Sequence, residues 1–191
     1  MVRKLKRQLE VKIILDSREQ DETLLTSIKL DKKYGSDKIK ICEIEKKCFK
    51  ALGCKTSTGD LGIEVRFEGE TKWRKTKLSI ELKRLSDIVN TLYSSFKRFK
   101  NELARADENN LDFWILHDFG FNEVQEHIKK LQAMRKMSYK TQPYYTYLEN
   151  YLNVARQYGL VCCSDNFEST IRRIIKKHVI ENRLQYDYEL E

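Results

Sequence analysis

Short apolar runs alternate with longer amphipathic segments along this chain. Residues 11–16 (VKIILD) form an apolar run that is rich in β-branched residues and too short for a helix, which predicts a buried strand that ends in a carboxylate. Residues 38–45 predict a weaker strand. Residues 60–67 (DLGIEVRF) alternate apolar and polar side chains with a period of two, and residues 78–82 (LSIEL) repeat the apolar run after a turn at Gly69. The last two segments predict a hairpin.

Helical spacing dominates the second half of the chain. Ser86 is expected to cap an amphipathic helix with apolar residues at positions 88, 92, 96, 99 and 103. Later helices are expected over residues 122–137, 144–158 and 168–180, and strands over residues 111–116 and 160–163. Gly159 is expected to close the helix before it. Strands that alternate with helices predict an α/β domain, with a mixed sheet covered on both faces.

The composition indicates one domain. The chain has 191 residues, 40% hydrophobic content, one proline and seven glycines, and it contains no linker-like tract. We therefore expect a single domain over residues 1–191. Its core is expected over about residues 11–184, between a short basic N-terminal arm and an acidic C-terminal tail.

The net charge of the chain favours some classes of binding partner over others. The 37 Lys and Arg against 29 Asp and Glu give a net charge of +8, which favours a polyanion such as nucleic acid. No stretch approaches the roughly 20 apolar residues of a membrane span, and residues 1–12 lack the apolar core of a signal peptide. We expect no membrane partner and a cytoplasmic location. The alternatives are a nucleoid-associated protein, a phage-encoded protein or, in a eukaryote, a nuclear protein. The five cysteines include no Cys-x-x-Cys pair, so reduced thiols are expected.

Charged residues stand at the ends of three predicted strands. These clusters are Asp16 with Arg18 and Glu19, Gly59 with Asp60, and Glu81 with Lys83. A sheet that brings such strand ends together would build an oxygen-rich pocket suited to Mg²⁺ or Mn²⁺. Such an ion polarises a phosphate and lowers the pKa of a bound water, while a nearby lysine stabilises the charge that develops on the phosphate.

Glu81 and Lys83 are two residues apart on one predicted strand, so both side chains are expected on the same face, with Leu82 facing the core. Taken alone, this spacing is more often a solvated ion pair at a strand end. The combination of the three clusters favours a metal-binding catalytic pocket over a solvated ion pair.

In the order of these motifs the sequence resembles the XPF and Hef type of structure-specific endonucleases, a branch of the PD-(D/E)XK nuclease superfamily. Members carry a strand that ends in Asp-x-Arg-Glu, then Gly-Asp, then Glu-Arg-Lys with an Asp at the start of the next helix. The matching residues here are Asp16-Ser17-Arg18-Glu19, Gly59-Asp60, Glu81-Leu82-Lys83 and Asp87. The resemblance covers most of the chain. It implies a restriction-endonuclease-like three-layer sandwich, with a central mixed β-sheet flanked by helices.

The resemblance also implies roles for these residues. The metal ligands for Mg²⁺ or Mn²⁺ would be Asp60, Glu81, Asp16 and Glu19. Lys83 would contact the attacking water or the scissile phosphate, which makes these five residues the catalytic set, with Asp87 in support. Leu82 replaces the arginine of the family motif, so Arg18 or Arg84 is expected to supply a cation.

The resemblance further implies a homodimer or heterodimer formed through the nuclease domain, with the C-terminal helices as candidate contacts. Members often add a pair of helix-hairpin-helix motifs. The residues after His178 are too few and too acidic to form that pair, so the resemblance is to the nuclease domain without it.

Basic residues on two predicted helices are candidates for DNA contact. They are Lys97 and Arg98, where the family has comparable residues, and Arg172, Arg173 and Lys176 on the last helix. Such a run is usually a solvated face, but a basic chain with a nuclease motif favours phosphate contacts. Among the histidines, His117 at a strand end is expected to be structural, and His127 and His178 are expected to be solvated.

These patterns together predict a Mg²⁺-dependent endonuclease that hydrolyses DNA phosphodiester bonds without a covalent intermediate. The resemblance suggests branched or flap substrates in repair, recombination or replication. One alternative is a non-catalytic DNA-binding module of the same fold, against which the retained Asp60, Glu81 and Lys83 argue. The other is a nuclease that acts on RNA or on a specific sequence, which nothing in the chain excludes.

Overall fold

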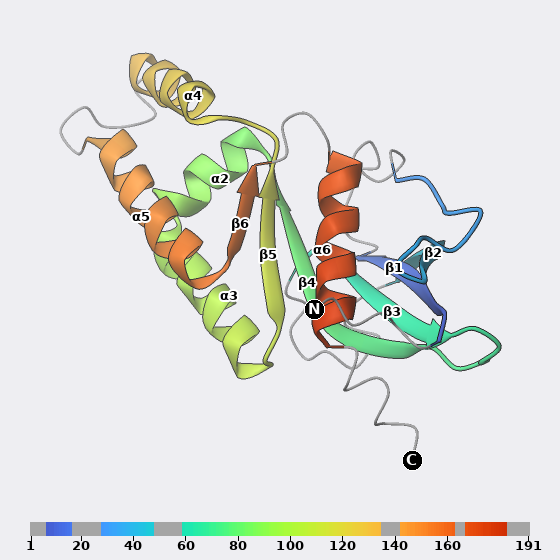
Figure 1. Cartoon of the computed structure of the whole chain (residues 1–191). Helices are drawn as coiled ribbons and strands as arrows, with labels where there is room; N and C mark the ends of the chain where they lie inside the picture. Colours follow the sequence, from blue (N-terminus) through green and yellow to red (C-terminus); the bar gives the residue numbers. More distant parts are fainter. Residues whose placement is uncertain (1–6, 17–27, 48–58, 135–141, 163–166, 183–191) are drawn as a thin grey trace. The chain divides into compact units, whose positions relative to one another are not determined.

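The computed structural model describes residues 7–16, 28–47, 59–134, 142–162 and 167–182 (Figure 1). Contacts group the chain into two compact units. The first unit comprises Met1–Ser79 and Asn166–Glu191, and the second unit comprises Ile80–Asp165. A single domain over residues 1–191 stays a prediction.

Six strands form a mixed sheet in the order β2-β1-β3-β4-β5-β6. They are β1 (Leu9–Asp16), β2 (Ile39–Lys47), β3 (Leu61–Phe67), β4 (Arg74–Lys83), β5 (Asp112–His117) and β6 (Gly159–Cys162). β1 pairs in parallel with β2 and antiparallel with β3, and β5 pairs in parallel with β6. Every predicted strand is present, although β4 begins at Arg74 rather than at residue 78. The predicted α/β class, with a mixed sheet flanked by helices, is confirmed.

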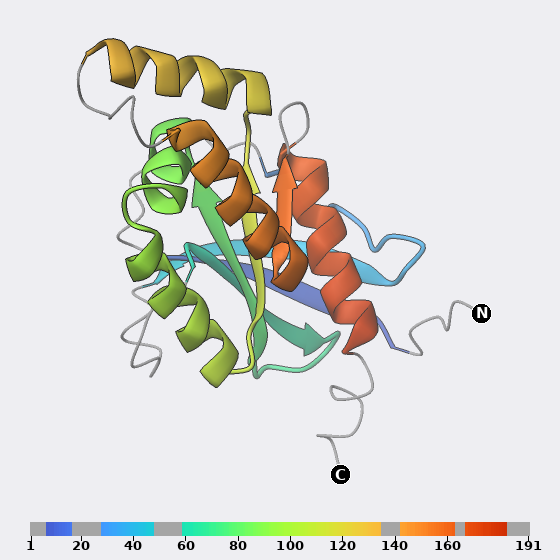
Figure 2. The same cartoon turned by 90° about the vertical axis from the view of Figure 1, so that its left-hand side faces the viewer.

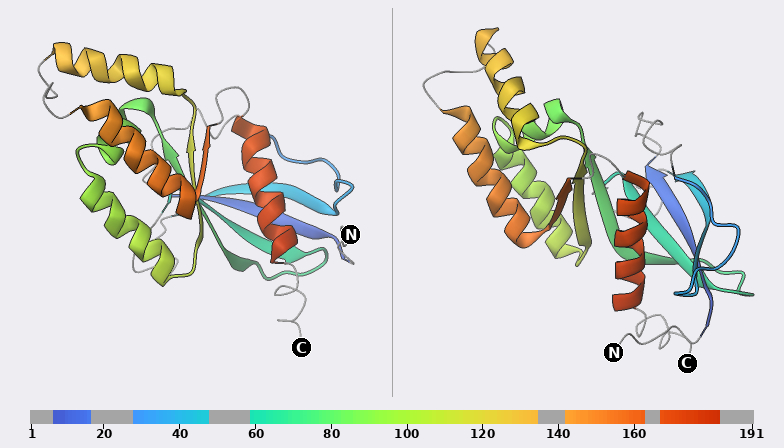
Figure 3. Two further views of the ribbon diagram at one scale, coloured as in Figure 1. Left: turned by 60° about the vertical axis from the view of Figure 1, so that its left-hand side comes forward. Right: turned by 45° about the horizontal axis from the view of Figure 1, so that its top comes forward.

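The first unit is built from β1, β2, β3, the start of β4 and helix α6 (Phe167–Glu181), which lies beside these strands (Figure 3). Its core combines strand residues with an apolar stripe on α6, where residues three and four apart share a face. The buried side chains of α6 include Ile171, Ile174, Ile175 and Val179. His178 is also buried, at 2% exposure, so the expectation that it is solvated was wrong. It follows Ile174 by four residues, which places it in the same stripe.

The second unit contains the other described helices around β5 and β6. They are α2 (Leu85–Leu92), α3 (Phe96–Glu108), α4 (Phe121–Ala133) and α5 (Pro143–Gln157). Figure 2 shows α5 lying over β5 and β6, with α3 alongside. The core contains Ile115 of β5 together with Leu92, Phe99, Val124 and Tyr147 from the four helices. No helix in the described part of the chain is long and apolar enough to cross a membrane.

The single helix expected after Ser86 is in fact two helices, and Ser86 is not the cap because α2 already begins at Leu85. The carbonyl of Leu92 at the end of α2 accepts a hydrogen bond from another helix, since the side-chain amide of Asn150 on α5 donates to it at 2.7 Å. The chain then restarts as α3 at Phe96. The apolar spacing continues across the break, which is why the pattern alone predicts one helix.

Gly159 is the first residue of β6 and not the cap of α5, which ends at Gln157. It pairs with Trp114 on β5. A Cβ at position 159 would collide with the indole ring of Trp114, including Cζ3 at 2.8 Å. The absence of a side chain at Gly159 therefore serves the close approach of this ring.

Candidate active site

The end of β4 carries the candidate residues Glu81 and Lys83. The Lys83 Nζ lies 2.5 Å from Oε1 of Glu81, and the two side chains are only 15% and 14% exposed. The same ammonium lies 6.0 Å from the centroid of the Phe99 ring on α3. The pairing confirms that positions 81 and 83 share one face of the strand, as the period of two predicts.

Leu82 does not lie in the core, contrary to the prediction. It is half-buried, while β4 is continuously buried only from Leu78 to Ile80. The last residues of the strand leave the core as the chain turns towards α2. A polar side chain at position 82 therefore meets less desolvation than a core position would impose.

Asp16 and Asp60 come together in the first unit, at one end of the β1–β3 ladder. Leu15 of β1 pairs with Leu61 of β3, and the next backbone N–H, that of Asp16, donates to the Asp60 carbonyl at 2.9 Å. Asp16 is 3% exposed and Asp60 is half-buried. Gly59, with φ of 88°, supplies the left-handed turn that leads the chain into this position.

The remaining predicted site residues are placed as follows. Glu19 and Arg18 lie outside the described residues. Asp87 is exposed in the first turn of α2, and Arg84 is exposed just before that helix. The Asp16 and Asp60 pair belongs to the first unit, whereas Glu81 and Lys83 belong to the second.

The donor chemistry of these carboxylates fits a hard cation such as Mg²⁺, which takes oxygen ligands. Within the described residues, however, no three His, Cys, Asp or Glu side chains gather in a group that could hold a metal ion. A complete ligand set therefore stays a prediction.

The predicted DNA contacts differ in their surroundings. Lys97 and Arg98 are exposed on the first turn of α3, and Arg173 is exposed on α6. Arg172 and Lys176 instead form ion pairs at 2.8 Å with Asp31 and Asp37, respectively. Sequence reasoning missed both aspartates. Arg172 and Asp31 lie 141 positions apart, so no local pattern reports their contact.

His117 at the end of β5 is buried and structural, as the sequence suggested. Its Nδ1 lies 2.9 Å from the Phe119 carbonyl oxygen, and its Nε2 lies 3.2 Å from the Tyr151 hydroxyl. Because a carbonyl can only accept, Nδ1 carries the proton and the Tyr151 hydroxyl donates to Nε2. Burial lowers the pKa of His117 below its usual value, although the hydrogen bond to Phe119 acts in the opposite direction.

This lowered pKa makes His117 a source of acid sensitivity. The unfolded chain binds a proton at this residue more readily than the folded one, so its stabilising effect is present above the unfolded pKa of about 6.5 and is lost as pH falls below it. We expect a His117→Asn variant, whose amide can still donate to Phe119, to lose less stability than the wild type between about pH 7.5 and 5. Thermal melts across this range test it, and parallel losses in both proteins would contradict it.

No protein-family model matches the chain, and no curated protein matches its sequence. The resemblance to the XPF and Hef nucleases therefore rests on the residue pattern alone.

Proposed function

We propose that the chain is a metal-dependent endonuclease that hydrolyses DNA phosphodiester bonds, with Asp60, Glu81 and Lys83 at the centre of its active site. The observation that carries the proposal is the pairing of Glu81 with Lys83 on one face of β4, at 2.5 Å. In such a pair the carboxylate can bind a metal ion, and the ammonium can stabilise the negative charge that develops on a phosphate.

Lys83 would stabilise the negative charge that develops on the scissile phosphate. Its side chain is 15% exposed, so its ammonium is partly shielded from water and acts more strongly on a nearby charge than a fully solvated lysine would. Glu81 holds the ammonium in place before substrate arrives. An aspartate or glutamate that fixes the position of a cation reduces the reorganisation needed during the reaction.

The carboxylates would provide the metal ligands. A backbone hydrogen bond of 2.9 Å joins Asp16 to Asp60 at the end of the β1–β3 ladder, which brings the backbone positions of these two carboxylates together. The sequence motif adds Glu81, and Glu19 outside the described residues, to the proposed ligands for Mg²⁺ or Mn²⁺. A divalent ion, when bound, supplies positive charge that polarises the phosphodiester and makes water more acidic.

In the proposed reaction, the oxygen of a water molecule attacks phosphorus in line with the leaving oxygen. The P–O bond to that oxygen breaks and no bond to the protein forms. The attacking water gives up a proton to solvent, and the leaving oxygen takes up a proton from solvent. The proposal further includes branched or flap DNA as substrate, a homodimer or heterodimer, a cytoplasmic or nucleoid location, and a role in repair, recombination or replication.

A cleavage assay tests the proposal. Purified protein is mixed with end-labelled flap, fork, nicked, linear duplex and RNA substrates in Mg²⁺, in Mn²⁺ or in EDTA. We expect cleavage of DNA with either ion, none in EDTA, and recovery when the ion is restored. DNA binding without cleavage would favour the non-catalytic module, and cleavage of RNA alone would favour the ribonuclease alternative.

A further inference from the structure

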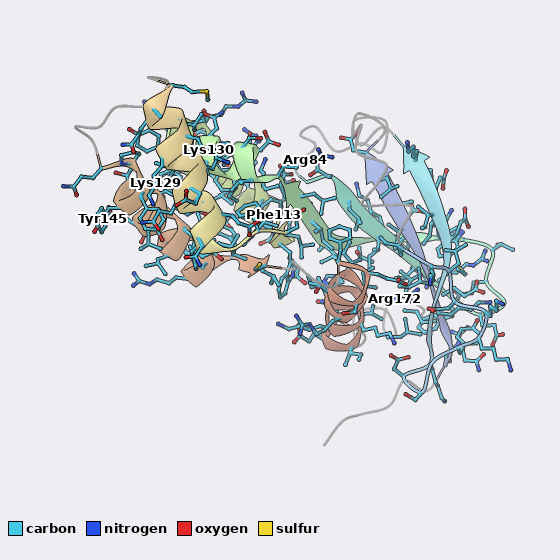
Figure 4. All side chains as sticks on the ribbon, turned by 90° about the horizontal axis from the view of Figure 1, so that it is seen from above. Arg84, Phe113, Lys129, Lys130, Tyr145 and Arg172 are labelled. Atoms are coloured by element: carbon cyan, nitrogen blue, oxygen red, sulfur yellow. The ribbon has the colours of Figure 1, made fainter. Side chains whose placement is uncertain are left out.

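The segment over residues 28–38, between β1 and β2, is fastened to α6. The Glu168 carboxylate accepts the backbone N–H of Lys29 at 3.1 Å. Arg172 donates to Asp31 at 2.8 Å and also to the Lys29 carbonyl, and Figure 4 shows its place on α6. Lys176 pairs with Asp37 at 2.8 Å. Both ends of the segment are therefore fixed to one helix.

The two aspartates of this segment are directed inward. Asp31 places one oxygen on Arg172 and accepts the Ile41 N–H with the other at 2.8 Å. Asp37 likewise pairs with Lys176 and accepts the Ile39 N–H at 3.1 Å. Each aspartate thus joins the backbone at the start of β2 to a cation on α6. Their negative charges are balanced within the structure and contribute little to the outer surface.

We use the name cation ridge for the exposed cations of residues 28–38 and of α6, the helix to which this segment is bonded. Its members are exposed Lys and Arg side chains, namely Lys29, Lys32, Lys33, Arg173 and Lys177. Residues 28–38 and 167–182 together contain eight Lys and Arg against four Asp and Glu. Lys177 has a partner in Glu181 at 4.0 Å, but both side chains are more than half exposed, so this pair is weak.

We propose that the cation ridge binds the phosphate backbone of duplex DNA. Exposed lysines contact phosphates without reading bases, and the attraction follows from charge complementarity between the ridge and a polyanion. The inward pairs hold the backbone that carries these lysines, which lowers the entropy lost on binding. Arg172 and Lys176 act as clamps for the ridge and do not touch DNA. The inference rests on the proposed function, since it takes the substrate of the nuclease as the ligand.

The experiment measures DNA binding in EDTA by fluorescence anisotropy of a labelled duplex, between about 50 and 200 mM salt. The test variant is Lys32→Ala/Lys33→Ala. The matched control is Lys129→Ala/Lys130→Ala, which removes the same charge from an adjacent exposed pair on α4 in the second unit (Figure 4). We expect the test variant to bind roughly tenfold or more weakly, with a salt slope flatter by about two. We expect the control to stay within about twofold of the wild type.

Equal losses in both variants would overturn the proposal, because net charge alone would then explain binding. Unchanged binding in the test variant would overturn it too, as would wild-type binding to anionic phospholipid vesicles but not to DNA. The cleavage assay tests the nuclease proposal independently of this binding measurement. If the wild type cuts no substrate but the test variant alone loses DNA binding, the cation ridge proposal is supported and the nuclease proposal is contradicted. If the wild type cuts DNA but the test variant binds DNA as tightly as the wild type, the nuclease proposal is supported and the cation ridge proposal is contradicted.

Discussion

Replacing Lys83 with alanine is expected to lower the rate of the proposed DNA cleavage by roughly 10²–10³-fold, the loss expected when one charge-stabilising group is removed from a reacting phosphate. Binding is expected to change little, because a single cation near the reacting bond contributes a small part of the total phosphate contact. Single-turnover cleavage and anisotropy measure the two effects on the same protein. Lys75→Ala is the matched control, since Lys75 is an exposed lysine on the same strand.

The carboxylates at the other candidate positions give the companion result. Glu81→Ala and Asp60→Ala are each expected to abolish cleavage, because each removes a proposed metal ligand and neither removes core packing. Both residues are half-buried, so the melting temperature should change little. If the Asp60→Ala variant cuts DNA at the wild-type rate, the assignment of the site is wrong.

The largest expected effect on stability is that of Gly159→Ala. A methyl group at this position would overlap the indole ring of Trp114, whose Cζ3 atom is 2.8 Å from the Cβ position. The ring is rigid and lies against the parallel pairing of β5 with β6, so relief requires the strands or the ring to shift. We expect a loss of about 2 kcal/mol in the free energy of unfolding, and a melting temperature lower by roughly 4–8 °C.

Two further variants decide whether this collision is the cause. Gly120→Ala is the control, because its nearest neighbour across the turn is the flexible carboxylate oxygen of Glu123 at 3.7 Å. It should melt close to the wild type. In a Trp114→Leu background the smaller side chain leaves room for the methyl group, so Gly159→Ala should cost much less there. An equal cost in both backgrounds would rule out contact with the ring.

The sequence determined the types of element and the facing of residues within each strand. The period of two over residues 60–67, and the same period at positions 81 and 83, follows from the pleat of a strand and needs no knowledge of neighbours. The same local rule predicted that Glu81 and Lys83 share a face. Strands that end in carboxylates were likewise visible, and Asp16 and Asp60 do meet at one end of a ladder.

The tertiary structure decided what each segment meets. The break after Leu92 is satisfied by Asn150, which lies 58 residues away in the chain. Arg172 pairs with Asp31, which lies 141 positions away in the chain, whereas Lys32 and Lys33 are exposed. Leu82 is half-buried because burial depends on where a strand leaves the core. A pattern along the chain encodes periodicity, whereas the partner of a charge and the burial of a strand end depend on contacts between segments that are distant in sequence.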